Sequence, residues 1–360
     1  MGDLPGWHKR LTETGPQGAA ERLLVALLIP CGWGYGLLMW GRAALYRQGL
    51  FRIYRAPVPV VAVGNLAVGG TGKTPVVDYV VKELLARGRR VAIVSRGYGG
   101  SGLPGVGLVS AGDGTGPLLP ASTCGDEPYL LARRNPAAVV LVAPRRAAGI
   151  ARAVAAHGAE VIVLDDAFQH LAVARDLDLV LLDARRPLSN GRVLPAGRLR
   201  EFPAALDRAD LLLLTRSEGG EVPALPVTKP LCHCCHALDP LARSLSGEAR
   251  PLADLAGRAV FAFAGIAEPE SFFSALRGAG LTLAGSLPLP DHVVYDETTL
   301  ARLRAAAAGA EILVTTEKDG VKLRADDLPL SCYEVPVTVA FAEAAPLAAR
   351  LERLLKKEPQ

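Results

Sequence analysis

Residues 58–80 of the chain are VPVVAVGNLAVGGTGKTPVVDYV, and this stretch decides the fold. It begins with the β-branched residues of a buried strand (58–63) and continues through a glycine-rich turn. A helix follows, whose apolar residues recur at three- and four-residue steps from Val76 to Leu85 and stop at Gly88. Strand, glycine-rich turn and helix in this order form a phosphate loop, in which backbone N–H groups and the positive helix end face phosphate oxygens. The stretch therefore predicts a nucleotide-binding α/β fold.

The polar residues of this loop indicate how it binds ATP. In a phosphate loop the lysine contacts the outer phosphates and the hydroxyl group after it binds Mg²⁺. Lys73 and Thr74 hold these two positions, and Pro75 suits the first helical turn because its φ is fixed. Ala67 stands where the usual spacing has glycine, which leaves the entry geometry of the loop open. We expect ATP and Mg²⁺ as the cofactors.

Further short apolar runs indicate a parallel sheet covered by helices on both faces, because near-continuous apolar strands alternate with helical patterns. These runs are residues 91–95, 138–142, 161–164, 179–182 and 211–214. Sites in such sheets lie beyond the carboxyl ends of the strands. Gly64, Arg96, Asp165 and Asp183 fall at those ends.

A change of composition between residues 225 and 248 indicates a domain boundary, because prolines and a Cys/His cluster replace the helical pattern there. A second, smaller α/β unit follows, with strands predicted at 260–264, 281–285, 312–316 and 333–339 and helices at 270–277, 298–308 and 347–356. We therefore predict three segments: an amino-terminal membrane-associated helix (1–50), a phosphate-loop kinase domain (51–228), and a linker with a smaller carboxy-terminal α/β domain (229–360).

Charge and cysteine content exclude several classes of protein. The 40 basic and 36 acidic residues give a formal charge of +4, too weak a field for a duplex nucleic-acid partner. Six cysteines in 360 residues do not make a disulfide framework, so a reducing, cytoplasmic setting fits best. The cluster Cys232-His233-Cys234-Cys235-His236 lacks the second half of a tetrahedral zinc site. We expect it to be an extended segment whose alternate members face the core and the solvent.

Residues 23–41, LLVALLIPCGWGYGLLMWG, contain no charge and predict contact with a membrane. As one helix they reach about 28 Å, which is marginal for spanning, and Pro30 with three glycines is expected to weaken or kink it. We favour a helix in one leaflet; a buried core helix stays open, and export is disfavoured because no cleavage pattern follows. Basic residues that suit anionic headgroups flank the segment: Lys9, Arg10, Arg42, Arg47, Arg52 and Arg55.

A second motif with chemical meaning, EVIVLDD, is a predicted strand that ends in the acidic residues Asp165 and Asp166. Such a pair holds Mg²⁺ or its water opposite the loop threonine, and helix capping is the alternative. His170 follows closely enough in the sequence to contact the nucleotide.

Kinases that act on an alcohol also use a base that accepts the hydroxyl proton, and positive groups that neutralise the migrating phosphoryl group. Asp126 or His292 is a candidate for the base, and Arg96 and Lys318 are candidates for the positive groups. Glu127 and Glu201 are further single candidates without an assigned task.

A series of motifs resembles the tetraacyldisaccharide 4'-kinase (lipid A 4'-kinase) family, in matching order from about Val58 through Lys322. The motifs are GNLAVGGTGKTP (64–75), SRGYGG (95–100), GDEP (125–128), DDAFQH (165–170) before RDLDLVLLDA (175–184), NGRVLPAGRLRE (190–201), FAGIAEPESFF (263–273), DH (291–292) and TTEKDGVK (315–322). The resemblance implies transfer of the ATP γ-phosphoryl to the 4'-hydroxyl of a tetraacylated glucosamine disaccharide 1-phosphate. It also implies work at the cytoplasmic face of the bacterial inner membrane, with no obligate protein partner.

The resemblance further implies roles for single residues. Asp126 is the base, and His292 pairs with it from the second domain, so that domain closure assembles the site. Lys73 also acts in catalysis. The residues implied to bind nucleotide are Gly69, Gly70, Thr71, Gly72, Lys73, Thr74, Arg96 and His170. The residues implied to organise the metal are Thr74, Asp165, Asp166 and Glu201.

Three positions depart from the family pattern: Ala167, Arg198 and Val293 stand where glycine, proline and a second histidine are expected. None of them removes a proposed catalytic group. Two other functions remain open, a membrane-associated ATPase or GTPase that acts as a conformational switch and a scaffold that only binds nucleotide. An acceptor-independent hydrolysis would favour the switch, and failure to bind ATP would favour the scaffold.

Overall fold

The computed structural model describes residues 10–12, 15–97, 100, 105–217, 219–220 and 224–356. Lys9 and two residues of the SRGYGG motif, Tyr98 and Gly99, lie outside the described residues. The chain forms two compact units that interleave along the sequence. The first comprises Met1–Lys73, Glu160–Cys235 and Phe341–Gln360, and the second comprises Thr74–Ala159 and His236–Ala340. The division into three consecutive segments, 1–50, 51–228 and 229–360, stays a prediction.

The first unit contains a parallel sheet in the order β8-β7-β6-β1-β5. Its strands are β1 (Val60–Asn65), β5 (Val161–Asp165), β6 (Leu177–Asp183), β7 (Leu211–Thr215) and β8 (Leu231–Leu238). Every residue of β1, β5 and β7 is buried, because strands of a parallel sheet are covered on both faces. The unit also holds the 3₁₀ helix η1 (Pro203–Arg208) and α10 (Ala345–Lys356). The predicted α/β fold is confirmed.

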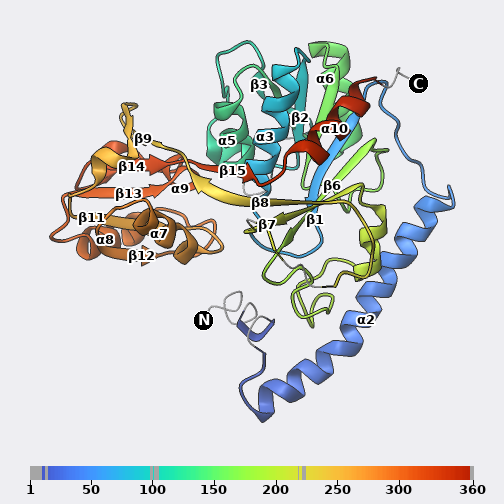
Figure 1. Ribbon diagram of the computed structural model, residues 1–360, viewed down its shortest axis with the longest axis horizontal. Coiled ribbons are helices and arrows are strands. Elements are labelled where there is room, and N and C mark those ends of the chain that lie inside the picture. The colour runs from blue at the N-terminus through green and yellow to red at the C-terminus, as the bar shows by residue number, and fades with distance from the viewer. Residues whose placement is uncertain are drawn as a thin grey trace. The chain divides into compact units, whose positions relative to one another are not determined.

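The amino-terminal apolar segment is one helix, α2 (Ala19–Arg47), whose helical backbone runs without interruption through Pro30 (Figure 1). Two of its glycines pack against the loop before η1. A Cβ on Gly32 would lie 3.1 Å from the carbonyl oxygen of Val193, and one on Gly36 would overlap the ring of Phe202. Only 17% of its most apolar window is buried, so the alternative of a core helix is not supported. Its large exposed side chains are Leu23, Leu24, Leu27, Trp33, Leu37, Leu38 and Trp40.

This packing gives a test of how α2 is held. We expect Gly36→Leu to lower the midpoint of thermal unfolding, because overpacking of this kind costs about 1–3 kcal/mol. Gly34→Leu is the matched control, since a Cβ on Gly34 has nothing within 4 Å. Circular dichroism in mild detergent compares the two variants with the wild type. Equal midpoints for both variants would contradict the glycine-mediated contact.

The second unit begins with α3 (Lys73–Ala86) and three strands. β2 (Val91–Ser95) pairs in parallel with β4 (Val139–Val142), and β3 (Gly107–Ala111) pairs with β4 in the antiparallel sense. Two helices, α4 (Ala121–Cys124) and α5 (Asp126–Arg134), lie between β3 and β4 in the chain, and α6 (Arg146–His157) follows β4. α6 packs closely on β2, since a Cβ on Gly149 would lie 2.7 Å from a methyl group of Val94.

The same unit contains a six-stranded sheet in the order β10-β9-β14-β13-β11-β12 (Figure 1). Its strands are β9 (Leu241–Ser244), β10 (Ala249–Pro251), β11 (Val260–Ala264), β12 (Leu283–Pro288), β13 (Ile312–Thr316) and β14 (Cys332–Val335). The sequence predicted β11 to β14 but missed β9 and β10, a short antiparallel pair without an apolar run. The predicted strand 333–339 is two strands, β14 and β15 (Val337–Phe341), separated at Pro336, which has no N–H to donate.

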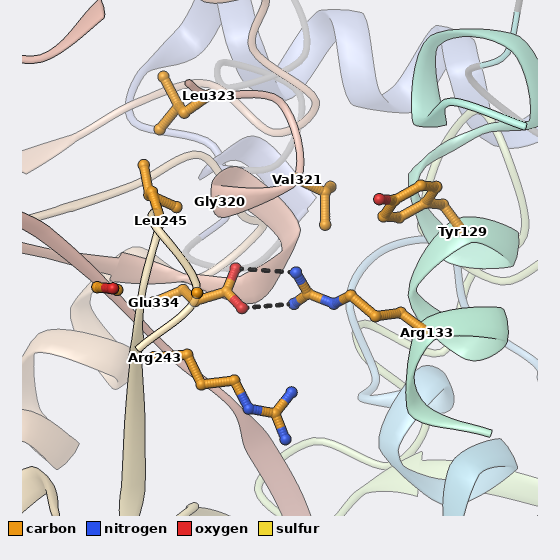
Figure 2. Close-up of a pocket in the computed structure, with 10 residues that line it drawn as sticks. Tyr129, Arg133, Arg243, Leu245, Gly320, Val321, Leu323 and Glu334 are labelled. Carbon is orange, nitrogen blue, oxygen red and sulfur yellow. Dashed lines mark hydrogen bonds and ion pairs between the residues drawn. The ribbon is translucent and has the colours of Figure 1, made fainter. Parts of the chain in front are cut away.

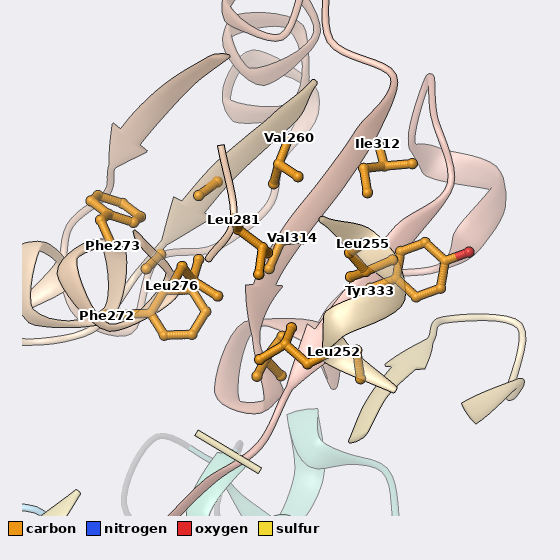
Figure 3. Packing of buried hydrophobic residues seen from close by; sticks show 14 residues of the cluster. Leu252, Leu255, Val260, Phe272, Phe273, Leu276, Leu281, Ile312, Val314 and Tyr333 are labelled. Carbon is orange, nitrogen blue, oxygen red and sulfur yellow. The ribbon is translucent and has the colours of Figure 1, made fainter. Parts of the chain in front are cut away.

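Helices cover both faces of this sheet. On one face Phe272, Phe273 and Leu276 of α7 (Pro269–Gly278) pack with Val260 and Val314 (Figure 3). A second cluster joins Leu300 and Leu303 of α8 (Glu297–Ala306) to Phe263 of β11 and Leu313 of β13. Short helical turns complete the unit: η2 (Leu252–Leu255), α9 (Glu317–Gly320) and η3 (Ala325–Asp327).

The Cys/His cluster lies in β8, as the expected extended segment. Cys232 and Cys234 are buried, at 1% and 0% exposure, while their neighbours are partly exposed. His233 Nδ1 lies 2.7 Å from Ser217 Oγ. Burial therefore alternates from Leu231 to Cys235, whereas the residues from Cys235 to Leu238 are all partly exposed.

Candidate functional site

The phosphate loop connects β1 to α3, and hydrogen bonds to residues 198–200 set its course. The N–H group of Val68 donates to the carbonyl oxygen of Arg198 (2.8 Å), and the Arg198 guanidinium donates to the carbonyl oxygen of Val68 (2.9 Å). Ala67 forms a β-bridge with Leu199. An extended residue needs no glycine, so this bridge explains why alanine is tolerated at the loop entry.

Asn65, at the carboxyl end of β1, anchors the middle of the loop. Its side-chain amide donates to Thr71 Oγ1 at 2.9 Å, and both residues are buried. Gly69 and Gly72 adopt φ values of 110° and 76°, which favour glycine. Lys73 then begins α3, with Thr74 as its second residue. Sequence reasoning missed Asn65, although its place at a strand end was the available signal.

Asp165 is the last residue of β5, where it pairs with Val63 of β1, and Asp166 follows it. Asp166 Oδ1 lies 3.6 Å from Lys73 Nζ, so the structure brings these two predicted residues together. Arg200 Nη1 binds both carboxylate oxygens of Asp166, at 3.0 and 3.1 Å. Asp165 is 2% exposed. A carboxylate held between two cations offers oxygen atoms of the kind that hard metal ions bind.

The donor set fits Mg²⁺ with few protein ligands. Among the described residues no group of three or more His, Cys, Asp or Glu side chains is placed to hold a metal ion. Glu201 is instead 2.8 Å from Arg208 and 4% exposed. Mg²⁺ at nucleotide sites commonly uses one or two carboxylates together with phosphate oxygens and water. Asp165 and Asp166 meet this requirement, and a metal role for Glu201 stays a prediction.

Arg216, which follows β7, is a further residue at the loop that sequence reasoning missed. Its guanidinium forms an ion pair with Asp183 at the end of β6 and donates to the carbonyl oxygen of Gly70 at 3.2 Å. His170 lies in the turn after β5, where its carbonyl oxygen accepts from Arg175 at 3.1 Å. Contact of His170 with nucleotide stays a prediction.

A second cluster surrounds Asp126 in the other unit. Asp126 is the first residue of α5, and its Oδ2 lies 3.3 Å from His292 Nδ1 and 3.0 Å from Lys322 Nζ. Lys318 Nζ lies 3.1 Å from His292 Nε2 and 2.9 Å from Asp291 Oδ1. The predicted pairing of Asp126 with His292 is therefore present. Lys322 was missed, although its spacing of four residues from Lys318 places both on one side of a helical turn.

Burial and neighbouring charges act in opposite directions on Asp126. Burial raises its pKa, but the hydrogen bond with His292 and the positive charge of Lys322 outweigh this effect, so the pKa lies below its usual value of 3.8. Because the folded-state pKa is lowered, the stabilisation is complete above pH 3.8 and is lost as the pH falls below it. Asp126 is thus ionised at neutral pH.

Backbone strain is concentrated at these clusters. Non-glycine residues with left-handed φ in the described ranges are Asp166 (48°), Ser189 (54°), Arg216 (60°) and His292 (58°). Such conformations cost about 1–3 kcal/mol each and persist where the surroundings determine them. Arg96, by contrast, is exposed directly after β2, and its next residue, Gly97, lies near Cys124 at the start of the segment that carries Asp126.

A phosphate loop, a lysine beside paired strand-end aspartates and a partly buried carboxylate–histidine pair define an ATP-dependent phosphotransferase. A family model described as tetraacyldisaccharide-1-P 4'-kinase matches residues 24–356. The chain belongs to this family, as the sequence motifs predicted.

Individual relatives agree with this assignment. The tetraacyldisaccharide 4'-kinase of Syntrophotalea carbinolica is 50% identical, covering 99% of this chain and 100% of the relative. That of Geobacter sulfurreducens is 45% identical over 97% and 99% of the two chains. A crystal structure of LpxK from Aquifex aeolicus in complex with ATP has a TM-score of 0.78 at 32% identity, covering 92% of this chain and 99% of that one.

The charge of Lys73 can be tested directly. We expect Lys73→Met to reduce phosphoryl transfer by about 10²–10³-fold, the usual effect of removing a group that stabilises transition-state charge. Lys356→Met, at the exposed carboxyl end of α10, is the matched control and should retain activity. Release of ADP measured with both variants checks the prediction, and comparable rates would contradict it.

Proposed function

We propose that the chain transfers the γ-phosphoryl group of ATP to the 4'-hydroxyl of tetraacyldisaccharide 1-phosphate. The observation that carries the proposal is the family match over residues 24–356, which includes both charged clusters. The ATP in the related LpxK structure supports ATP as the donor. The product is the bisphosphorylated lipid A precursor of lipopolysaccharide synthesis.

The first cluster is proposed to bind the nucleotide. Backbone N–H groups of residues 69–74 face the phosphates, and Lys73 neutralises the charge of the transferred group. Arg216 holds the loop through the carbonyl oxygen of Gly70. Mg²⁺ bound by Asp165, Asp166 and Thr74 would supply charge neutralisation at the β- and γ-phosphates. Arg96 and His170 remain proposed nucleotide contacts, and Glu201 a proposed metal organiser.

The second cluster is proposed to activate the acceptor. Lys318 is a donor toward His292 Nε2, which leaves the Nδ1–H group of the imidazole to donate to Asp126 Oδ2. Lys322 binds the same oxygen, so Oδ1 is the oxygen that accepts the proton of the 4'-hydroxyl. His292 and Lys322 orient the base and keep it ionised, and Asp126 is the catalytic residue.

The pH dependence of turnover tests this role. We expect Asp126→Asn to abolish turnover because an amide cannot accept the proton. Lys322→Met removes a charge that lowers the pKa of Asp126, so the acid limb of the kcat profile should move to higher pH. Lys318→Met should move it less, because Lys318 binds Asp291 and His292. An unchanged acid limb in Lys322→Met would refute the assignment.

We further propose that α2 attaches the enzyme to the cytoplasmic face of the inner membrane as a peripheral or monotopic anchor. Its apolar side chains are exposed, and Arg42, Arg47, Arg52 and Arg55 follow them. Vesicle flotation tests the anchor: we expect the wild type to float with vesicles that contain anionic lipid. A variant with Leu27, Trp33 and Leu38 changed to Ser should stay in the soluble fraction. Flotation of both proteins alike would exclude this face.

Product analysis tests the reaction itself. Purified protein with ATP, Mg²⁺ and the tetraacyl disaccharide 1-phosphate should yield a product heavier by one phosphoryl group, located at the 4'-position by fragmentation. ATP hydrolysis that is independent of the disaccharide, with no phosphorylated lipid, would favour the conformational-switch alternative.

A further inference from the structure

A second group of charges joins the same two helices that carry the Asp126 cluster. Arg133 and Arg134 are the last residues of α5, and Glu317 is the first residue of α9. Arg133 Nη2 lies 3.0 Å from Glu317 Oε1 and 2.7 Å from Glu334 Oε1 of β14. Arg134 Nε donates to Glu317 Oε2 at 2.7 Å. We call Arg133, Arg134, Glu317 and Glu334 the arginine–glutamate clasp.

The carboxylates of the clasp are deeply buried. Glu317 and Glu334 are 3% and 4% exposed. Burial raises the pKa of Glu334, and the charge of Arg133 offsets only part of this effect. The desolvation free energy of a buried ion pair is often larger than the attraction between its charges. Stabilisation of the fold is therefore a poor explanation for these ion pairs. A geometric role is the better explanation.

Apolar packing does not fill the space beside the clasp. A cavity of about 360 Å³ lies there, lined by residues of α5, α9 and the β9–β10 turn (Figure 2). Tyr129 and Arg133 of α5 stand on one side of it, and Gly320, Val321 and Leu323 on another. Beside this open pocket the ion pairs of Arg133 and Arg134 with Glu317 join α5 to α9.

The clasp and the base are connected through short, rigid elements. Asp126 begins α5, a nine-residue helix about 13 Å long, and Arg133 and Arg134 end it. Lys318 and Lys322 follow Glu317 by one and five residues. A shift of α5 along α9 would therefore change the distance between Asp126 and Lys322.

From this arrangement we infer that Arg133, Arg134, Glu317 and Glu334 are positioning residues that hold Asp126 against Lys322 and His292. The inference rests on the proposed role of Asp126 as the base. It assigns the clasp no contact with either substrate.

Several groups besides the clasp face Asp126 and enter any pH profile. They are Cys124 at the end of α4, His292 and Tyr295 after β12, and Lys318 and Lys322 in and after α9. All of them remain in place in the variants below. A shift in the acid limb then reports the position of Asp126 relative to these groups.

Glu317→Gln is the primary test, because glutamine keeps the shape of the side chain and removes its charge. We expect kcat to fall by about 10–10²-fold, since small displacements of reacting groups have effects of this size. The KM for ATP should stay within about twofold, and the acid limb of the kcat profile should move to higher pH as Lys322 loses its contact with Asp126. Arg134→Lys, which keeps the charge but not the forked geometry, should show the same changes in weaker form.

Two controls separate position from charge and from stability. Arg243 lies 3.8 Å from Glu317 but is carried by β9, so Arg243→Gln changes the local charge without releasing α5 and should keep the wild-type profile. Glu297→Gln removes an exposed ion pair with Arg304 on α8 and should also be neutral. Thermal unfolding of each variant identifies the temperature at which all are folded.

The outcomes distinguish the inference from the proposed function. Wild-type protein that phosphorylates the disaccharide, together with folded Glu317→Gln and Arg134→Lys variants that lose only thermal stability, would overturn the inference alone. An acid limb that moves equally in Arg243→Gln would also overturn it, because the effect would then be electrostatic. Absence of disaccharide phosphorylation by the wild type would instead overturn the proposed function.

Discussion

The parallel register of β1 with its neighbours is the constraint on which the nucleotide site depends. Val63 of β1 pairs with Asp165 of β5, and Asn65 pairs with Leu181 of β6, two residues before Asp183. Parallel strands end at one edge of a sheet, so the sheet topology alone brings the polar residues at their ends close together. A shift of one residue would turn these side chains to the opposite face of the sheet.

Much of this arrangement could be predicted from the sequence, because each element carries a local signal. The apolar runs gave the parallel strands, and loop spacing identified Lys73. Pairing of Asp126 with His292 came only from the family resemblance, since 166 residues separate them and no periodicity links them. The contacts of Arg200 and Arg216 could not be predicted, because no sequence pattern distinguishes these two residues from the other arginines. Their partners, Asp166 and Gly70, become visible only in three dimensions.

The two clusters use positive charge in different ways. Lys73 and Arg200 approach Asp166, a partly exposed acid for which a metal ion is the proposed partner. Lys322 and His292 both approach Oδ2 of Asp126. A carboxylate is the proposed metal ligand at the first place and the proposed proton acceptor at the second, so the same chemical group has two different tasks.

The glycine face of α2 has a consequence for making a soluble form of the enzyme. Gly32 and Gly36 cover Val193 and Phe202, and the same loop carries Arg198 and Arg200. Removal of the helix would expose the apolar side chains of this loop to solvent. It would also weaken the support of Arg198 and Arg200, which bind the nucleotide loop and Asp166. Detergent-free preparations are therefore better sought by replacing the outward leucines and tryptophans with polar residues than by removing the helix.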